Sequence, residues 1–193
     1  MLNIKEWQKL LDREKQEYID CGANNRFSHD GHELARWFGV IISKFEGRIL
    51  DIGCGVIPLP EYMKGSNAEW YGIDPIDIDV EREFNFTKGM AEKLPYKNEF
   101  FDAVIFATSL NHLCDVIAAE KETYRVLKKG GVVIIWTGLI SEKRYKEWKA
   151  NGGSCDSKHL WGFTESSIRK IFSRFTVENW IVNGTSNVII FKK

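Results

Sequence analysis

The sequence predicts an α/β domain with a doubly wound, mostly parallel sheet and helices on both faces. Apolar runs typical of buried strands alternate with helical patterns between residues 47 and 137, as strand–helix–strand units do. Farther on, two strand patterns flank Asn183-Gly184, a turn signal that predicts a hairpin and an antiparallel edge strand. The chain of 193 residues is long enough for a single such domain with a full core.

Two amphipathic helices are expected before the first strand, over residues 2–20 and 30–45. In the first, apolar side chains from Trp7 to Tyr18 fall near helical spacing among charged residues. The second carries an i, i+3, i+4 apolar stripe, and Gly47 then ends it.

The segment that follows is the strongest indicator of function. An apolar run ends in Asp51, and Gly53 and Gly55 stand on either side of Cys54. Glycines permit positive φ and a close approach of a ligand to the backbone. Pro58 suits the first position of a helix, whose first N–H groups would be free donors. The pattern predicts a nucleotide-like cofactor at the carboxyl end of a parallel strand.

A second apolar run ends in another acid, Asp74, which Pro75 follows. Asp74 lies 23 residues after Asp51, close to the ~20 residues at which an acid meets ribose hydroxyls in folds of this kind. A carboxylate there can accept both hydrogens of a ribose diol. The alternative is a turn or N-cap role for this aspartate before the proline.

Three later motifs complete an ordered set: Ala91-Glu92 before Leu94-Pro95, Phe101-Asp102 in an apolar strand over about 100–107, and Leu127–Gly131 before a strand over 132–136. The set covers roughly residues 47–137 and resembles the class I S-adenosylmethionine-dependent methyltransferases, in the branch of small bacterial-type single-domain members. The resemblance implies a Rossmann-like fold with a seven-stranded sheet, and S-adenosyl-L-methionine as the cofactor.

The resemblance also implies which residues contact the cofactor. The methionine part would be cradled by the glycine loop, Asp51, Gly53, Cys54 and Gly55. The ribose hydroxyls would be held by Asp74, beside Pro75. The adenine would lie along Met90, Ala91 and Glu92, and the end of the fourth strand would contribute Thr108, Ser109 and Leu110.

His112, just beyond the fourth strand, is the candidate catalytic base. An imidazole titrates near neutrality and could take a proton from an acceptor O–H or N–H, and Asp115 could orient the ring. The alternative is a structural histidine that caps the next helix, because methyl transfer can proceed by alignment alone.

Acceptor specificity is expected from segments outside the shared core. The polar segment Asn24–His32, with His29 and His32, could close over the site. The segment Leu139–Phe163 carries aromatic residues that could contact an acceptor or pack onto the sheet, namely Tyr145, Trp148, His159 and Trp161. It includes a helix over about 141–150 and the turn-rich residues 151–156. A further helix is expected to begin at Thr164, a favoured N-cap residue.

Composition narrows the function classes. The formal net charge is zero, with 27 basic and 27 acidic side chains, which argues against a nucleic-acid substrate. The four cysteines are widely spaced, which indicates free thiols, and the four histidines have no metal-ligand spacing, so no metal is expected. No apolar run is long enough for a membrane span or a signal peptide, and we expect a cytoplasmic protein.

The sequence thus predicts one domain, 1–193, that methylates the oxygen, nitrogen or carbon of a small-molecule acceptor. It comprises N-terminal helices that could form a lid (1–46), a cofactor-binding core (47–137), a substrate-side insertion (138–163) and a C-terminal helix and hairpin (164–193). Ile57 and Pro58 depart from the family's glycine loop, which leaves a non-catalytic cofactor-binding relative as the alternative. An NAD-type oxidoreductase is disfavoured because Pro58 stands where the third glycine of the dinucleotide fingerprint would be. The acceptor and the oligomeric state stay open.

Overall fold

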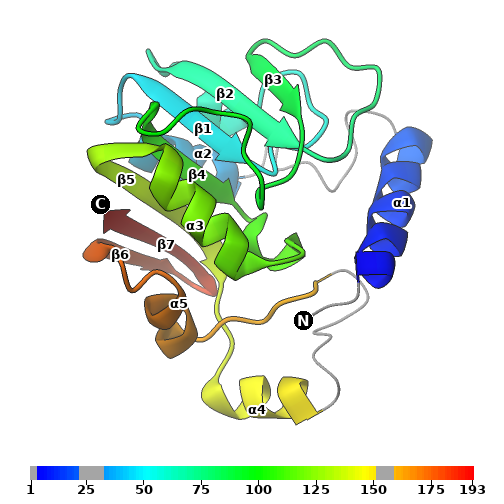
Figure 1. The fold of residues 1–193 in the computed structure, drawn as a ribbon, viewed down its shortest axis with the longest axis vertical. Coiled ribbons are helices and arrows are strands. Elements are labelled where there is room, and N and C mark those ends of the chain that lie inside the picture. The colour runs from blue at the N-terminus through cyan, green and yellow to red at the C-terminus, as the bar shows by residue number, and fades with distance from the viewer. Residues whose placement is uncertain (1–3, 22–32, 151–158) are drawn as a thin grey trace.

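The computed structural model describes residues 4–21, 33–150 and 159–193, and these form a seven-stranded sheet with helices around it (Figure 1). In sheet order the strands are β3 (Asn85–Lys88), β2 (Glu69–Asp74), β1 (Arg48–Ile52), β4 (Phe101–Ala107), β5 (Leu127–Gly138), β7 (Ser186–Lys192) and β6 (Thr176–Asn183). The first five are parallel to one another, whereas β7 is antiparallel to both β5 and β6. The mostly parallel sheet and the terminal hairpin at its edge are therefore confirmed.

The order of the strands creates a switch point. From β1 the chain moves outward through β2 and β3 on one side and then returns to place β4 on the other side of β1. In open α/β sheets, ligands bind beyond the carboxyl ends of the strands at such a reversal. The fold therefore directs attention to the loops after β1 and β4.

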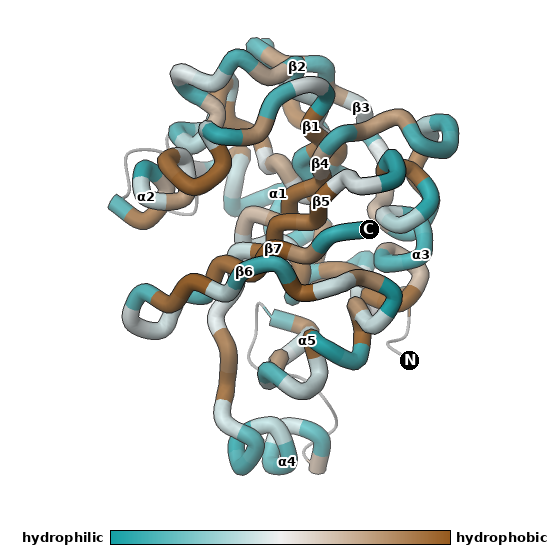
Figure 2. Tube along the Cα trace, turned by 90° about the vertical axis from the view of Figure 1, so that its left-hand side faces the viewer, coloured by the Kyte–Doolittle hydropathy of each residue, from teal (hydrophilic) through white to brown (hydrophobic). Residues whose placement is uncertain are grey.

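Helices pack against both faces of the sheet. Helices α3 (Val116–Val126) and α5 (Glu165–Ile171) cover one face and α2 (Glu33–Ile42) covers the other, whereas α1 (Ile4–Cys21) and α4 (Glu142–Ala150) lie apart from the two faces (Figure 1). Alternate residues of β4 join separate buried clusters, with Val104 and Phe106 on the face that α3 and α5 cover and Ile105 on the face that α2 covers. Figure 2 shows the central strands as the most hydrophobic part of the chain.

Several predicted elements are confirmed. Helices α1, α2 and α4 occur in the ranges expected for them, although α2 ends at Ile42 and not at Gly47, and α5 begins after Thr164. The side chain of Thr164 accepts a hydrogen bond from the Ser167 N–H, and the Ser167 side chain accepts one from the Thr164 N–H, which forms a capping box. The predicted turn over residues 151–156 and the segment Asn24–His32 lie outside the described residues.

The helix expected to begin at Pro58 is absent, and this prediction is wrong. The connection from β1 to β2 contains only a single 3-10 turn, Glu61–Met63. The reason is a pair of prolines: Pro58 and Pro60 each disfavour helical backbone at the preceding residue, and Pro60 itself is extended, with φ −54° and ψ 140°. The connection from β2 to β3, residues 75–84, also has no helix.

Across the parts of the chain that the structure describes, none of the helices combines the length and the apolar character that a membrane crossing requires.

Candidate functional site

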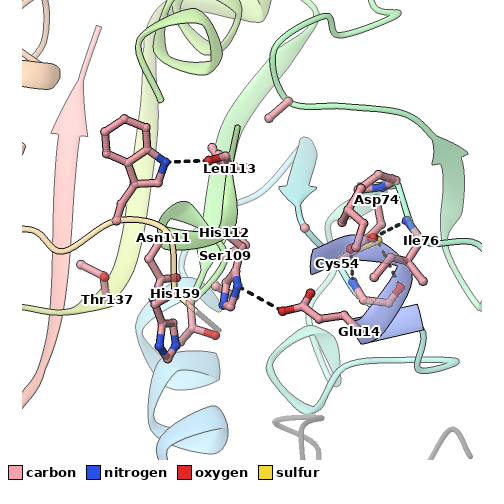
Figure 3. Close-up of a pocket in the computed structure, with 18 of the residues that line it drawn as sticks. Glu14, Cys54, Asp74, Ile76, Ser109, Asn111, His112, Leu113, Thr137 and His159 are labelled. Carbon is pink, nitrogen blue, oxygen red and sulfur yellow. Dashed lines mark hydrogen bonds and ion pairs between the residues drawn. The ribbon is translucent and has the colours of Figure 1, made fainter. Parts of the chain in front are cut away.

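A cavity of about 730 Å³ lies at the carboxyl ends of β1, β2, β4 and β5 (Figure 3). Its volume falls within the range of about 300–1,000 Å³ that is typical of small-molecule sites. Most of the residues named for the cofactor from sequence line it: Gly53, Cys54, Gly55, Asp74, Pro75, Met90, Ala91, Glu92, Thr108 and Ser109. Two residues of that set, Asp51 and Leu110, do not line the cavity, and both are fully buried.

The glycine loop after β1 packs directly against the end of β4. Gly53 has a φ of +78°, and a Cβ added to it would lie 2.4 Å from the Cβ of Ser109. The Ser109 hydroxyl donates a hydrogen bond to the carbonyl of Ile52, which ties the two strand ends together. Gly55 has a φ of +72°, and a Cβ added there would meet nothing within 4 Å. The loop thus needs glycine for close packing at one position and for backbone conformation at both.

Asp74, at the end of β2, presents its carboxylate to the cavity while the backbone holds it (Figure 3). One oxygen accepts the Gly55 N–H at 2.9 Å and the other accepts the Ile76 N–H at 2.8 Å. Burial raises the pKa of Asp74 to about 6, although both hydrogen bonds and the charge of Arg82 act in the opposite direction. Each oxygen retains a further lone pair that can accept a ligand hydroxyl.

Asp51 supports the loop from below. Its Oδ2 accepts the Tyr62 O–H at 2.6 Å, and its Oδ1 has no hydrogen-bond partner. Burial raises the pKa of Asp51 to about 7, and the nearby charge of Asp74 adds to the rise. Asp51 is therefore placed to shape the loop and not to touch a ligand in the cavity.

The wall formed after β4 is tightly constrained. Thr108 has a φ of +60°, which is unusual for a β-branched residue, and its N–H donates to the carbonyl of Trp136 at 2.9 Å. Such backbone strain persists only where the surroundings impose it, often at functional sites. Glu92 accepts the Asp115 N–H at 2.9 Å and so fixes the loop after β3 to the start of α3.

His112 also lines the cavity, but its carboxylate partner differs from the one expected. The Oδ1 of Asp115 accepts the N–H groups of Ile117 and Ala118 and so caps α3. The carboxylate that faces the ring belongs to Glu14 of α1, whose Oε1 lies 3.4 Å from Nδ1 of His112 (Figure 3). The expectation that Asp115 orients His112 is therefore corrected.

Helix α1 covers the open side of the cavity. One of its faces contributes five lining residues, Trp7, Leu11, Glu14, Glu17 and Tyr18. The Trp7 indole N–H also donates to the carbonyl of His112 at 3.1 Å. The sequence pattern revealed the apolar stripe of this helix, whereas nothing local to Glu14 showed that it faces His112.

The insertion after β5 contributes the remaining wall. His159 and Trp161 line the cavity, and the rings of His159 and His112 lie 5.0 Å apart, centroid to centroid. The Trp161 indole donates to the carbonyl of Leu113 at 2.6 Å. Tyr145 and Trp148 do not line the cavity and pack against each other instead, with ring centroids 5.2 Å apart.

The cysteine prediction is met where the structure tests it. Cys54 and Cys114 are free thiols, while Cys155 and the side chain of Cys21 lie outside the described residues, as do His29 and His32.

Comparisons with known proteins agree with this geometry. A family model described as a methyltransferase domain matches residues 50–135. The chain is 31% identical over 124 residues to a sterol 24-C-methyltransferase of Aspergillus fumigatus, an alignment that covers 58% of this chain and 32% of that protein. It is 37% identical over 60 residues to a ubiquinone/menaquinone biosynthesis C-methyltransferase of Coxiella burnetii, covering 31% of this chain and 24% of that one. The chain thus spans about a third or less of the length of these curated relatives.

Solved structures share the fold. A Thermotoga maritima protein described as an S-adenosylmethionine-dependent methyltransferase, possible histamine N-methyltransferase, superimposes with a TM-score of 0.66 at 22% identity, covering 98% of this chain and 99% of that one. The [4+2]-cyclase SpnF superimposes with a TM-score of 0.71 at 14% identity, covering 96% of this chain and 93% of that one.

The glycine loop yields a matched pair of variants. Gly53→Ala and Gly55→Ala both force a side chain into positive φ, which costs about 1 kcal/mol. Only Gly53→Ala also drives a Cβ into Ser109, so we expect a total loss of about 3 kcal/mol in the free energy of unfolding. Urea unfolding of both variants measures the difference. Equal losses would show that the loop does not pack against β4 as described.

The buried carboxyl groups predict that stability falls as the pH rises. The pKa of Asp51 is about 7 in the folded protein, against an ordinary value of 3.8. Between these values the native state holds a proton that the unfolded chain has released, so the free energy of unfolding decreases with pH. Asp51→Asn removes the titrating group, and with it a pH-dependent change in the free energy of unfolding on the order of 2–4 kcal/mol.

We therefore expect the fall in the free energy of unfolding between pH 5 and pH 8 to be clearly smaller in Asp51→Asn than in the wild type. Chemical unfolding at both pH values provides the measurement, and Asp79→Asn, at an exposed position, is the control. An unchanged fall in Asp51→Asn would contradict the raised pKa.

Proposed function

We propose, from its membership of the class I S-adenosylmethionine-dependent methyltransferases, that this chain methylates a small-molecule acceptor. The observation that carries the proposal is the placement of the glycine loop and the Asp74 carboxylate on one wall of a single cavity. The curated relatives that match part of the chain are named as a sterol 24-C-methyltransferase and a ubiquinone/menaquinone biosynthesis C-methyltransferase, which supports a small-molecule acceptor.

The residues of the cavity fit the cofactor of this family. Gly55 leaves open space where a side chain would otherwise intrude, as a backbone cradle for the methionine part requires. The Asp74 carboxylate can accept ribose hydroxyls through its remaining lone pairs. The loop of Met90, Ala91 and Glu92 forms the wall beside it, where the adenine would lie.

S-adenosylmethionine, when bound, supplies an electrophilic methyl group on a sulfonium sulfur. The work of the chain is then to align an acceptor and to exclude water, for which α1 and the insertion after β5 supply the walls. His112 is the candidate base: with Nδ1–H directed at Glu14, Nε2 is the nitrogen that can take the acceptor's proton. The Glu14 carboxylate would stabilise the imidazolium that forms.

A second candidate is a cofactor-binding relative that does not transfer the methyl group. The observation that favours it is the missing helix after the glycine loop, because the loop lacks the free N–H donors of a helix N-terminus. The cyclase with the same fold illustrates that the architecture serves other chemistry. A cytoplasmic location and a single-domain organisation stay predictions.

Cofactor binding can be tested by the thermal stability of the protein. S-adenosylhomocysteine at 100 times its dissociation constant should stabilise the protein by about 2.7 kcal/mol, visible as a rise in Tm, whereas NAD should not. Asp74→Ala should abolish the rise and Asp79→Asn should keep it, because only Asp74 lines the cavity. No rise with the wild-type protein would overturn the proposed function.

Kinetics of His112 variants would distinguish a catalytic base from a structural histidine. Once an acceptor is found, His112→Ala should lower kcat about tenfold or more while the affinity for S-adenosylhomocysteine stays unchanged. Glu14→Gln should lower kcat as well, because the His112 ring loses the carboxylate that faces its Nδ1. An unchanged kcat in His112→Ala would remove the base and leave alignment as the source of catalysis.

A further inference from the structure

Two connections that contain no α-helix meet behind the glycine loop. These are residues 53–68, between β1 and β2, and residues 75–84, between β2 and β3. Helices in such crossovers ordinarily brace the loops they follow. Here the two segments brace each other: the Glu83 N–H donates to the carbonyl of Pro58 at 2.9 Å, and Nη2 of Arg82 donates to the carbonyl of Gly55 at 3.3 Å.

Arg82 is held in place from several sides. Its side chain is only 4% exposed, and Nη1 lies 3.6 Å from Oδ1 of Asp77. The guanidinium lies over the ring of Phe86 on β3, 3.6 Å from the ring centroid, and Nη1 also reaches the carbonyl of Val80 at 3.5 Å. Burying a guanidinium is costly unless it is paired and hydrogen-bonded, so a position this enclosed fixes the direction of the donors.

One contact of Arg82 reaches the carbonyl of Gly55. The N–H of Gly55 donates to Asp74, and its carbonyl accepts from Arg82, so both backbone polar groups of the residue are hydrogen-bonded. Gly55 has positive φ, and a Cβ added to it would meet nothing within 4 Å. Besides Arg82, the Sγ of Cys54 donates a weak hydrogen bond to the same carbonyl at 3.8 Å. Removing the guanidinium would remove the hydrogen bond to the Gly55 carbonyl while leaving β1 and β2 paired.

We propose that Arg82 is a positioning residue for the methionine end of the cofactor, and that it replaces the brace which a helix after the glycine loop would provide. The inference rests on the proposed function, because it assumes that Gly53 and Gly55 receive that part of the cofactor. Arg82 does not line the cavity, so it acts through the orientation of the Gly55 peptide and through its charge behind the loop.

Two ligands that differ only at the methionine end test the inference. Titration calorimetry on Arg82→Met should show that S-adenosylhomocysteine binds about tenfold more weakly or worse, since a charge-assisted hydrogen bond is lost. The affinity for 5′-methylthioadenosine, which lacks the amino-acid part, should change much less. The ratio of the two affinities should therefore fall by about tenfold. Arg82→Lys keeps the positive charge but not the planar guanidinium, so the ratio should fall less in this variant than in Arg82→Met.

A matched control comes from Arg48, whose guanidinium lies 4.0 Å from the Phe100 ring centroid and does not line the cavity. Arg48→Met removes similar packing and should leave the ratio unchanged. A ratio unaltered in Arg82→Met would overturn the positioning role, even if both ligands bind more weakly. Should Arg82→Met fail to fold, an unaltered ratio in Arg82→Lys would overturn it equally. A wild-type protein that binds neither ligand would instead overturn the proposed function.

Discussion

The close approach of the β1 and β4 strand ends is the constraint on which the cavity depends. Gly53 leaves no room for a side chain against Ser109, and the Ser109 hydroxyl binds the carbonyl of Ile52. Thr108, the residue before Ser109, has positive φ at the same place, and its N–H donates to the carbonyl of Trp136. The same short connection buries Leu110 beneath α3 and leaves His112 at the cavity wall. The glycine loop and the segment that carries His112 are therefore joined by one packing contact.

The opposite wall is assembled from segments far apart in the sequence. His112 receives the Trp7 indole on its carbonyl and the Glu14 carboxylate at its ring, both from α1. His159 approaches the same ring from the insertion after β5. A movement of α1 would thus change the enclosure of the cavity and the surroundings of the His112 ring together. Enclosure of the cavity and the surroundings of the His112 ring are coupled in this arrangement, because one helix supplies both.

The sequence predicted the elements that depend on local patterns. Strand ends marked by Asp51 and Asp74, the cap at Thr164 and the turn at Gly184 all follow from residue type and spacing. Most of the cavity lining on the sheet side could be named for the same reason, since parallel strands end at one edge. The pairing of Glu14 with His112 could not, because it depends on where a separate helix docks. The helix after the glycine loop was predicted from the strand-and-glycine pattern, with Pro58 as its first residue, and the conformational effect of the second proline, Pro60, outweighed that signal.

The two buried acids show how the loop balances charge. Asp74 has two backbone N–H donors and the nearby Arg82 charge, whereas Asp51 has only the Tyr62 hydroxyl. Burial raises the pKa of both acids, and Asp74, the one that faces the cavity, has three groups that oppose the rise where Asp51 has one. The groups that favour the charged form of Asp74 are the N–H donors of Gly55 and Ile76 and the guanidinium of Arg82. Because Arg82 also donates to the carbonyl of Gly55, the conformation of the loop and the charge presented to the cavity depend on the same contacts.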